Sequence, residues 1–419
     1  MNLKKELTNI AKNALEASRA MSAVSSAKKN EVLKDMALAL IAKKEHILKA
    51  NKKDIAQAVT SRLSRAFIDR LTLDDKRIKE MSDSLIEISN LTDPVGEVIK
   101  AWDRPNGLKI EKVRVPIGVI AIIYESRPNV TSDCIGLCFK SGNSVILRGG
   151  SEALNSNLAI YQALIDVIKK HALPQGLVSM VATGDRRAVD TLLKLNDYID
   201  LVIPRGGESL IKHVTKSSRI PVIKHYKGIC HVYVDEWADL NMAENICYNA
   251  KVQRPGVCNA MESMLVHKDV AARFLPGMIK KFKEAGVEIR GCSITQRIIK
   301  KGIKRATEKD YFTEYLDLIL SVKVVGDLNE AIRHINHYGS HHSDSIVTDN
   351  RQNATEFLRK VDSACVYVNA STRFTDGYQF GFGAEIGIST DKLHARGPMA
   401  LEELTTYKYM GFGNGQVRI

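Results

Sequence analysis

The sequence has no long apolar stretch and no low-complexity tract. Its longest apolar runs, such as 36–42 and 117–124, are far shorter than the roughly 20 residues that a membrane-spanning helix needs. The first residues also lack the apolar core and the small-residue cleavage site of a secretory signal peptide. We therefore expect a cytoplasmic protein with no membrane partner.

Paired cysteines are also missing. The seven cysteines are an odd number, scattered from Cys134 to Cys365 without a C-x-x-C pair, which argues against a disulfide framework and a structural zinc site. We expect free thiols, most of them inert and buried. Four histidines lie between 334 and 342, but Gly339 is expected to end the helix among them, and no carboxylate-rich surroundings are evident. We predict no metal site.

The chain carries a formal net charge of +13, which raises the question of an anionic partner. Lys and Arg mostly alternate with Asp and Glu, and the densest basic clusters, 280–283 and 300–305, offer only Phe282 for stacking on bases. We expect solvated helix faces and no nucleic-acid partner. A sequence-independent nucleic-acid-binding protein stays the non-enzyme alternative.

At 419 residues the chain exceeds what one hydrophobic core supports, so two or three units are expected. Residues 1–90 are predicted to be helical, because apolar residues recur every three or four positions. Residues 98–115 alternate apolar and polar side chains around a turn, which predicts a hairpin. From 118 onward, short apolar runs alternate with helix-length segments, as is typical of a parallel α/β sheet. A second such region is expected between about 231 and 368.

Cys258 is the strongest candidate for a nucleophile. It follows a turn forced by Pro255 and Gly256, and Arg254 is close to it in sequence. A thiol on a rigid turn can be exposed to a cleft, and a positive potential favours its thiolate. A buried structural cysteine is the competing interpretation.

Two glycine turns follow predicted strands. The turn at 204–209 would present backbone N–H groups and a helix start to an anion, although a plain β-to-α turn explains it equally well, since G-x-G-x-x-G is absent. In the turn at 148–152, Arg148 could bind a ribose 2′-phosphate and Glu152 a ribose hydroxyl. Surface ion pairing is the alternative for both side chains.

A third polar segment, 124–129, directly follows an apolar strand, where ligand sites of α/β sheets tend to lie. Ser126 or Asn129 could donate to an oxyanion, and Arg127 could bind a phosphate. Loop capping is the competing role for all three residues.

Together these motifs resemble the aldehyde dehydrogenase superfamily. The resemblance covers almost the whole chain and includes VPIGVIAIIYESRPNVTSD at 115–133, VILRGGSEA at 145–153, VQRPGVCNAMESMLVH at 252–267, and VYVNASTRFTDGYQFGFGAEIGIST at 366–390. It implies an α/β fold with a Rossmann-type cofactor domain, an α/β catalytic domain and an oligomerisation flap with a C-terminal return. The domain limits it implies are 1–96 and 116–236, then 237–368, and finally 97–115 and 369–419.

The resemblance is closest to a branch that reduces an acyl phosphate. It implies NADPH-dependent reduction of L-glutamate 5-phosphate to L-glutamate 5-semialdehyde and phosphate through a cysteine thioester, in proline biosynthesis, by a homo-oligomer (dimer or tetramer). Aldehyde-oxidising relatives carry a glutamate base, where the stretch 221–228 offers Lys224 or His225 instead. Hydrolysis of the thioester should therefore be slow. A CoA-acylating aldehyde dehydrogenase stays the alternative enzyme.

The resemblance also implies roles for individual residues. The catalytic candidates are Cys258, Asn129 and Ser126, and the substrate-binding candidates are Arg127, Arg254 and Asn259. Arg373 and Arg396 are candidates for the charged groups at the far end of the substrate. The cofactor-binding candidates are Arg148, Ser151, Glu152, Pro204, Arg205, Gly206, Gly207, Glu208, Ser209 and Glu314.

Overall fold

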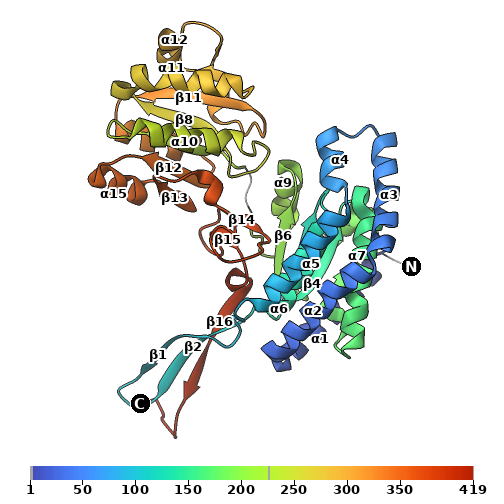
Figure 1. The fold of residues 1–419 in the computed structure, drawn as a ribbon. Helices are drawn as coiled ribbons and strands as arrows, with labels where there is room; N and C mark the ends of the chain where they lie inside the picture. Colours follow the sequence, from blue (N-terminus) through green and yellow to red (C-terminus); the bar gives the residue numbers. More distant parts are fainter. Residues whose placement is uncertain (1–2, 225–226, 419) are drawn as a thin grey trace. The chain divides into compact units, whose positions relative to one another are not determined.

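The computed structural model describes residues 3–224 and 227–418, which fall into two compact units (Figure 1). The first unit comprises Met1–Lys224, Gly381–Gly387 and Met399–Ile419, and the second comprises His225–Phe380 and Ile388–Pro398. No described helix is long and apolar enough to span a membrane.

The first unit is built on a four-stranded parallel sheet of order β5-β4-β3-β6. The continuous apolar runs predicted as strands form its centre, because a parallel sheet is buried on both faces. The strands are β3 (Val119–Tyr124), β4 (Ser144–Gly149), β5 (Val178–Met180) and β6 (Leu201–Arg205).

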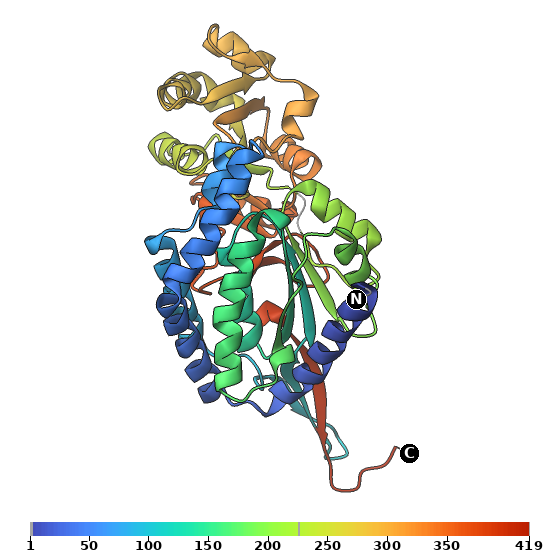
Figure 2. The same cartoon turned by 90° about the vertical axis from the view of Figure 1, so that its right-hand side faces the viewer.

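Helices cover both faces of this sheet. One buried cluster joins α1, α8 and α9 to β3, β4 and β6. In Figure 2 the blue helices α2 and α3 run beside the green helix α7. The predicted helical region before residue 90 is confirmed. The helices are α1 (Leu3–Ala20), α2 (Ser26–Ala42), α3 (Lys44–Thr60), α4 (Arg65–Leu71), α5 (Asp75–Asn90), α6 (Asn129–Lys140), α7 (Leu154–Lys170), α8 (Arg187–Leu192) and α9 (Glu208–Ser217).

The predicted hairpin is confirmed as β1 (Val98–Asp103) and β2 (Lys109–Pro116). The C-terminal strand β16 (Thr405–Phe412) pairs antiparallel with β2, which gives a three-stranded flap of order β1-β2-β16. Aromatic side chains of the flap are exposed, with Tyr409 at 60% and Phe412 at 50%. The flap therefore supplies an exposed apolar surface and two strand edges.

The second unit contains a seven-stranded parallel sheet of order β10-β9-β11-β8-β7-β12-β13. Alternate side chains of its strands point to opposite faces of the sheet. They pack into two hydrophobic cores, one with α10 and α11 and one with α14 and α15. The strands are β7 (Cys230–Val234), β8 (Met261–His267), β9 (Glu288–Gly291), β10 (Lys304–Arg305), β11 (Ile319–Val325), β12 (Ser343–Val347) and β13 (Cys365–Val368). The helices are α10 (Leu240–Val252), α11 (Lys268–Glu284), α12 (Ser293–Ile299), α13 (Glu308–Tyr311), α14 (Leu328–Tyr338) and α15 (Arg351–Lys360). A short pair, β14 (Gly387–Ser389) and β15 (Gly397–Met399), contributes residues to both units.

This division differs from the predicted domain limits in two places. Strand β7 pairs with β8 and β12 of the second sheet, whereas the limit at 236 assigned it to the first domain. The flap clusters with the first unit rather than standing apart. Strand pairing decides the first point only, because the three flap strands pair with one another and with no other described strand.

The four histidines between 334 and 342 are separated as expected, because α14 ends at Tyr338 before Gly339. Among the described residues, the group with metal-ligand spacing is Glu236, His267 and Asp269, which includes none of these four. His334 is 3% exposed, and neither of its ring nitrogens has a hydrogen-bond partner among the described residues. Its ring packs against those of Tyr311, Tyr338 and His231.

Burial of His334 predicts a specific loss of stability in acid. Burial, with a smaller contribution from His231, lowers the pKa of His334 from 6.5 to about 2. Below pH 6.5 the unfolded chain therefore binds a proton that the folded chain cannot, so stability falls with pH. We expect this residue alone to cost about 2 kcal/mol at pH 5. Urea unfolding of wild type and His334→Phe between pH 7.5 and 5 measures the difference, and equal pH slopes would contradict the assignment.

Candidate active site

Cys258 lies in the loop that joins α10 to β8, and its side chain is half-buried. A Cβ placed on Gly228 would overlap the carbonyl oxygen of Cys258, so the two backbones are in direct contact. The thiol of Cys230 donates to the same carbonyl oxygen at 3.2 Å. The backbone at Cys258 is thus held against the segment 228–230, which fixes the direction of the thiol.

Gly228 predicts a sharp local effect of a small substitution. A methyl group at this position meets backbone atoms of Cys258, which cannot rotate away as a flexible side chain would. We expect Gly228→Ala to destabilise the protein by about 1–3 kcal/mol and to lower kcat by displacing the thiol. Gly277→Ala is the matched control, because its added Cβ meets no atom within 4 Å. Equal unfolding midpoints and rates for the two variants would contradict this packing.

Glu314 contacts the other side of the same segment. The backbone N–H of Gly228 donates to the Glu314 carboxylate at 2.8 Å. Because Gly228 also contacts Cys258, one glycine connects the candidate nucleophile with the carboxylate that the resemblance assigns to the nicotinamide ribose. The second unit therefore brings Cys258 and Glu314 to one place.

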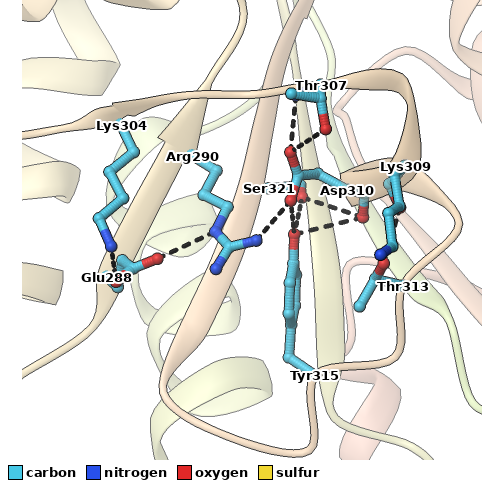
Figure 3. A network of polar contacts seen from close by, with 9 residues as sticks. All are labelled: Glu288, Arg290, Lys304, Thr307, Lys309, Asp310, Thr313, Tyr315 and Ser321. Atoms are coloured by element: carbon cyan, nitrogen blue, oxygen red, sulfur yellow. Dashed lines mark hydrogen bonds and ion pairs between the residues drawn. The ribbon is translucent and has the colours of Figure 1, made fainter.

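The polar network in Figure 3 anchors the segment that carries Glu314. The hydroxyl of Tyr315 hydrogen-bonds to the Asp310 carboxylate at 3.1 Å and to Ser321 at 2.9 Å. Asp310 also accepts from Thr307 and Arg290. Although burial alone would raise it, these bonds lower the pKa of Asp310 to about 2, so the carboxylate stays charged and the network stays intact at neutral pH.

A buried ion pair lies beneath this segment. Lys251 of α10 donates to Glu262 of β8 at 2.7 Å, and both side chains are at most 1% exposed. The second carboxylate oxygen of Glu262 accepts from the backbone N–H of Leu316, two residues after Glu314. Burial raises the pKa of Glu262 to about 7 and lowers that of Lys251, despite their mutual attraction. The pair joins the helix before Cys258 to the strand after it.

Asn259, a predicted substrate-binding residue, is buried directly after Cys258. It is 4% exposed, and its amide donates to the backbone of Thr375 at 2.8 Å. Its side-chain oxygen accepts from Arg373, and its backbone oxygen accepts from Thr372. These bonds occupy the side chain, so Asn259 attaches the segment 371–375 to the Cys258 loop. Arg254 lies exposed on the other side of the cysteine.

Most of the other cysteines differ from Cys258 in their burial. Cys134, Cys138, Cys230 and Cys247 are buried, and burial raises the pKa of each thiol. A raised pKa keeps a thiol protonated and unreactive. Besides Cys258, only Cys292 among the described cysteines is half-buried rather than buried.

In the first unit, the carboxyl ends of β3 and β6 are neighbours, since Tyr124 pairs with Arg205. Glu125 directly follows β3, and its carboxylate accepts from the backbone N–H of Gly207 at 2.8 Å. Gly207 precedes helix α9, whose N-terminus carries a partial positive charge. The Gly206-Gly207 turn therefore holds an anionic group already. Glu125 was missed by the sequence analysis, although it precedes Ser126 in a segment singled out there.

Ser126 and Glu152 meet at the ends of β3 and β4. Both the backbone N–H and the hydroxyl of Ser126 donate to one Glu152 carboxylate oxygen, at 2.8 and 3.2 Å. Ser126 has a φ of 51°, in the left-handed region, which turns both donors toward this carboxylate. Asn129 opens α6 on the surface and donates to Asp133 at 3.2 Å, and Arg127 is exposed.

Arg148 is more buried than expected, with 7% of the residue exposed. Its guanidinium donates to the carbonyl oxygens of Gly184 and Asp185 at 3.0 and 3.4 Å, which fixes the loop after β5. Burial lowers the pKa of Arg148, and the nearby positive charge of Arg186 lowers it further. Arg186 is exposed in that loop, and its side chain forms no hydrogen bond or ion pair with the described residues.

The other predicted cofactor residues also lie at this edge of the first sheet. Ser151 packs against Gly184, at 2.9 Å from a Cβ built on that glycine. Pro204 is buried in β6, and the guanidinium of Arg205 lies against Gly387. Glu208 and Ser209 begin α9, where Glu208 pairs with Lys212 at 2.7 Å. Lys224 ends the first unit, and His225 lies outside the described residues.

Comparisons with known proteins identify the family. The sequence profile of the aldehyde dehydrogenase family matches residues 2–290. A γ-glutamyl phosphate reductase of Thermodesulfovibrio yellowstonii is 56% identical over 418 residues, covering 100% of both chains. One from Caldanaerobacter subterraneus subsp. tengcongensis is 58% identical over 408 residues, covering 97% of this chain and 98% of the relative.

A solved structure extends the similarity to the fold. The crystal structure of γ-glutamyl phosphate reductase from Thermotoga maritima superposes with a TM-score of 0.97 at 48% identity, covering 99% of this chain and 100% of that one. The fold class expected from the sequence is confirmed. The chain therefore belongs to the aldehyde dehydrogenase family and, within it, to the γ-glutamyl phosphate reductases.

Proposed function

We propose that this chain catalyses the NADPH-dependent reduction of L-glutamate 5-phosphate to L-glutamate 5-semialdehyde and phosphate, in the cytoplasm, as a step of proline biosynthesis. The observation that carries the proposal is Cys258, a half-buried thiol on a loop whose backbone is fixed by Gly228 and Cys230. The names of the relatives supply the substrate.

In the first step the Cys258 thiolate attacks the acyl carbon of the substrate. A bond forms between Sγ and the carbon, the bond from that carbon to the phosphate oxygen breaks, and phosphate leaves with the electron pair. The product is a thioester on Cys258. Phosphate is a good leaving group, so the protein need not protonate it. We propose Arg127 and Arg254, both exposed, as its cationic contacts.

The oxyanion that forms during this attack needs hydrogen-bond donors. We propose the backbone N–H of Cys258 and the amide of Asn129. Ser126 is the weaker candidate, because both its donors are directed at Glu152. Each donor is worth about 3 to 4 kcal/mol of transition-state stabilisation.

The thioester must survive until it is reduced. The stretch 221–228, where aldehyde-oxidising relatives carry their base, contains no carboxylate in this chain. Water near the thioester therefore lacks a carboxylate base on this segment, which supports slow hydrolysis. Phosphate is then the acceptor of the acyl group in the reverse direction.

The N-terminus of α9 after the Gly206-Gly207 turn supports binding of an anionic dinucleotide, whose pyrophosphate would take the place of the Glu125 carboxylate at the N–H of Gly207. NADPH, when bound, would supply the hydride for the acyl carbon; the carbon–sulfur bond then breaks, which releases the aldehyde and restores the Cys258 thiolate. We propose that Gly206, Gly207, Glu208 and Ser209 hold its pyrophosphate. Ser151 and Glu152 hold the adenosine ribose, and Arg148 and Arg186 face its 2′-phosphate. Pro204 and Arg205 shape the turn, and Glu314 holds the nicotinamide ribose.

We also propose that the chain works as a homo-oligomer, dimer or tetramer, assembled through the flap. The exposed aromatic residues of β16 and the free edges of a three-stranded sheet support this. The substrate is a small acyl phosphate, and neither nucleic acid nor membrane is a partner. The basic clusters noted in the sequence are partly neutralised by acids, as in the pairs Lys281–Glu244 and Lys304–Glu288.

A steady-state assay in the reverse direction tests the function. Pyrroline-5-carboxylate, the cyclised aldehyde, and NADP⁺ are mixed with the enzyme, and NADPH is followed by absorbance with phosphate, with CoA, or with neither. We expect turnover with phosphate alone. Turnover with CoA would identify a CoA-acylating enzyme, and turnover with neither would identify an ordinary aldehyde oxidiser.

A further inference from the structure

Arg373 spans the loop that carries Cys258. It lies in the short 3-10 turn Thr372–Phe374, after β13. Its Nε donates to the side-chain oxygen of Gln253 at 2.9 Å, and its Nη1 donates to the side-chain oxygen of Asn259. Gln253 precedes the cysteine by five positions and Asn259 follows it. One guanidinium therefore bridges both ends of the Cys258 loop.

These two bonds use only part of what the guanidinium offers. Arginine carries five N–H donors, and the described residues accept from Nε and Nη1 alone. No carboxylate of the described residues forms an ion pair with Arg373. The other N–H donors of the half-buried Arg373 side chain remain available, and its orientation is fixed by the two bonds. Such a side chain is prepared for a planar contact with an anion.

The electrostatics of this place also favour an anion. Arg254 lies close enough that its charge, after burial, lowers the pKa of Arg373, whereas Asp376 and Cys258 act in the opposite direction. Arg254 itself forms no hydrogen bond or ion pair with the described residues. Two arginines thus lie beside the nucleophile, and no acid of the described residues pairs with either. Partial burial of an unbalanced positive charge is unfavourable, and a bound anion relieves it.

We infer that Arg373, held by Gln253 and Asn259, binds the phosphoryl group of the substrate together with Arg254. The inference rests on the proposed function. The phosphate is bonded to the carbon that Cys258 attacks, so its contacts must be close to the thiol. When the Sγ–carbon bond forms and the carbon–oxygen bond breaks, phosphate departs with the electron pair and takes a proton from water to give the dianion, whose charge two guanidinium groups match. Asn259 is then a positioning residue that acts through Arg373.

Arg396 supplies the contrast. Its guanidinium pairs with Asp362 at 2.8 Å, and Lys392 pairs with the other oxygen of that carboxylate. The Asp362 carboxylate thus has two cationic partners, Lys392 and Arg396, and they lower its pKa to about 2. The charge of Arg396 is therefore used within the protein. Of the two arginines considered for the substrate's charged groups, we retain Arg373 alone, and for the phosphoryl group.

The test uses the full chain without cofactor. Iodoacetamide alkylates Cys258, peptide mass spectrometry separates this site from Cys292, and inorganic phosphate is titrated to find the concentration that halves the rate. We expect Arg373→Ala to raise this concentration about 10- to 100-fold, as expected for a charge-assisted contact. Arg373→Lys should recover part of the loss. Arg396→Ala is the matched control and should leave it unchanged.

The reverse reaction gives a second readout. Arg373→Ala should raise the KM for phosphate and leave the KM for pyrroline-5-carboxylate within about threefold. An unchanged phosphate midpoint in Arg373→Ala, or a rise confined to the KM for pyrroline-5-carboxylate, would overturn the inference while leaving the proposed function intact. A wild-type enzyme that neither uses phosphate nor is protected by it would overturn both.

Discussion

Replacing Cys258 with alanine is expected to lower the rate of NADP⁺ reduction by about four orders of magnitude or more, because no other residue can form the thioester. The fold should be little affected, since the side chain is half-buried and the contacts with Gly228 and the Cys230 thiol involve the backbone of Cys258. Reverse-direction rates and urea unfolding of the same preparation measure the two effects.

The control for this prediction is Cys292→Ala. Cys292 is the other half-buried cysteine of the described residues, and its thiol lies near Thr295 at 3.3 Å, away from the Cys258 loop. Its replacement should leave the rate within about twofold. Retention of activity in Cys258→Ala, or an equal loss in both variants, would exclude Cys258 as the nucleophile.

Removing the amine of Lys251 is expected to cost about 3–5 kcal/mol of stability, because it leaves the Glu262 carboxylate buried without a cation. Lys251→Met at pH 8 is the direct test, by urea unfolding. The Glu262 pKa, already raised to about 7 by burial, rises further when the lysine is absent. The folded variant therefore takes up a proton as the pH falls, and it should regain stability toward pH 6.

The double variant Lys251→Met/Glu262→Gln separates the pair from its packing. Neither new side chain is charged, and glutamine retains an acceptor for the N–H of Leu316. We expect most of the lost stability to return. Destabilisation of the double variant equal to the sum of the single variants would mean that Lys251 and Glu262 contribute independently.

Much of the fold follows from local sequence pattern. Val119–Tyr124 is a continuous apolar run and Ser144–Gly149 has three apolar residues at its centre, and such segments, flanked by glycine, become the buried strands of a parallel sheet. The alternation at 98–115 marks the hairpin equally well. What local pattern does not contain is pairing, because hydrogen bonds between strands join residues far apart in the chain. Strand β7 illustrates this, because the pattern of apolar runs begins a second region at about 231 and the resemblance implies a limit at 236, whereas only the pairing of β7 with β8 and β12 shows which sheet it joins.

The candidate site was predictable where a residue type carries the chemistry. A cysteine after a Pro-Gly turn and a glycine pair before a helix are recognisable without a structure. The contacts that give these residues their setting were not predictable. Gly228 lies 30 positions before Cys258, and no feature of its neighbours in sequence indicates the contact. Arg373 lies more than 100 positions beyond the loop it bridges.

Residues with two chemically suitable roles were the hardest to assign. Ser126 and Asn259 both have donors that suit an anionic intermediate, and the sequence gives no reason to prefer another use. In the structure Ser126 is directed at Glu152, and Asn259 is directed at Thr375 and Arg373. Both bonds satisfy polar groups that burial would otherwise leave without partners, which is unfavourable. The hydrogen-bond partners of Ser126 and Asn259 therefore depend on which groups are buried beside them, and burial depends on the whole fold.

The central claim is that the acyl group on Cys258 is released to phosphate and not to water. The most direct measurement is a rapid mixing of enzyme, NADP⁺ and pyrroline-5-carboxylate without phosphate, followed by addition of phosphate. We predict a burst of NADPH equivalent to the enzyme, an acylated Cys258 by mass spectrometry, and steady turnover only after phosphate is added. Continuous NADPH formation before phosphate, with no acylated Cys258, would contradict the account.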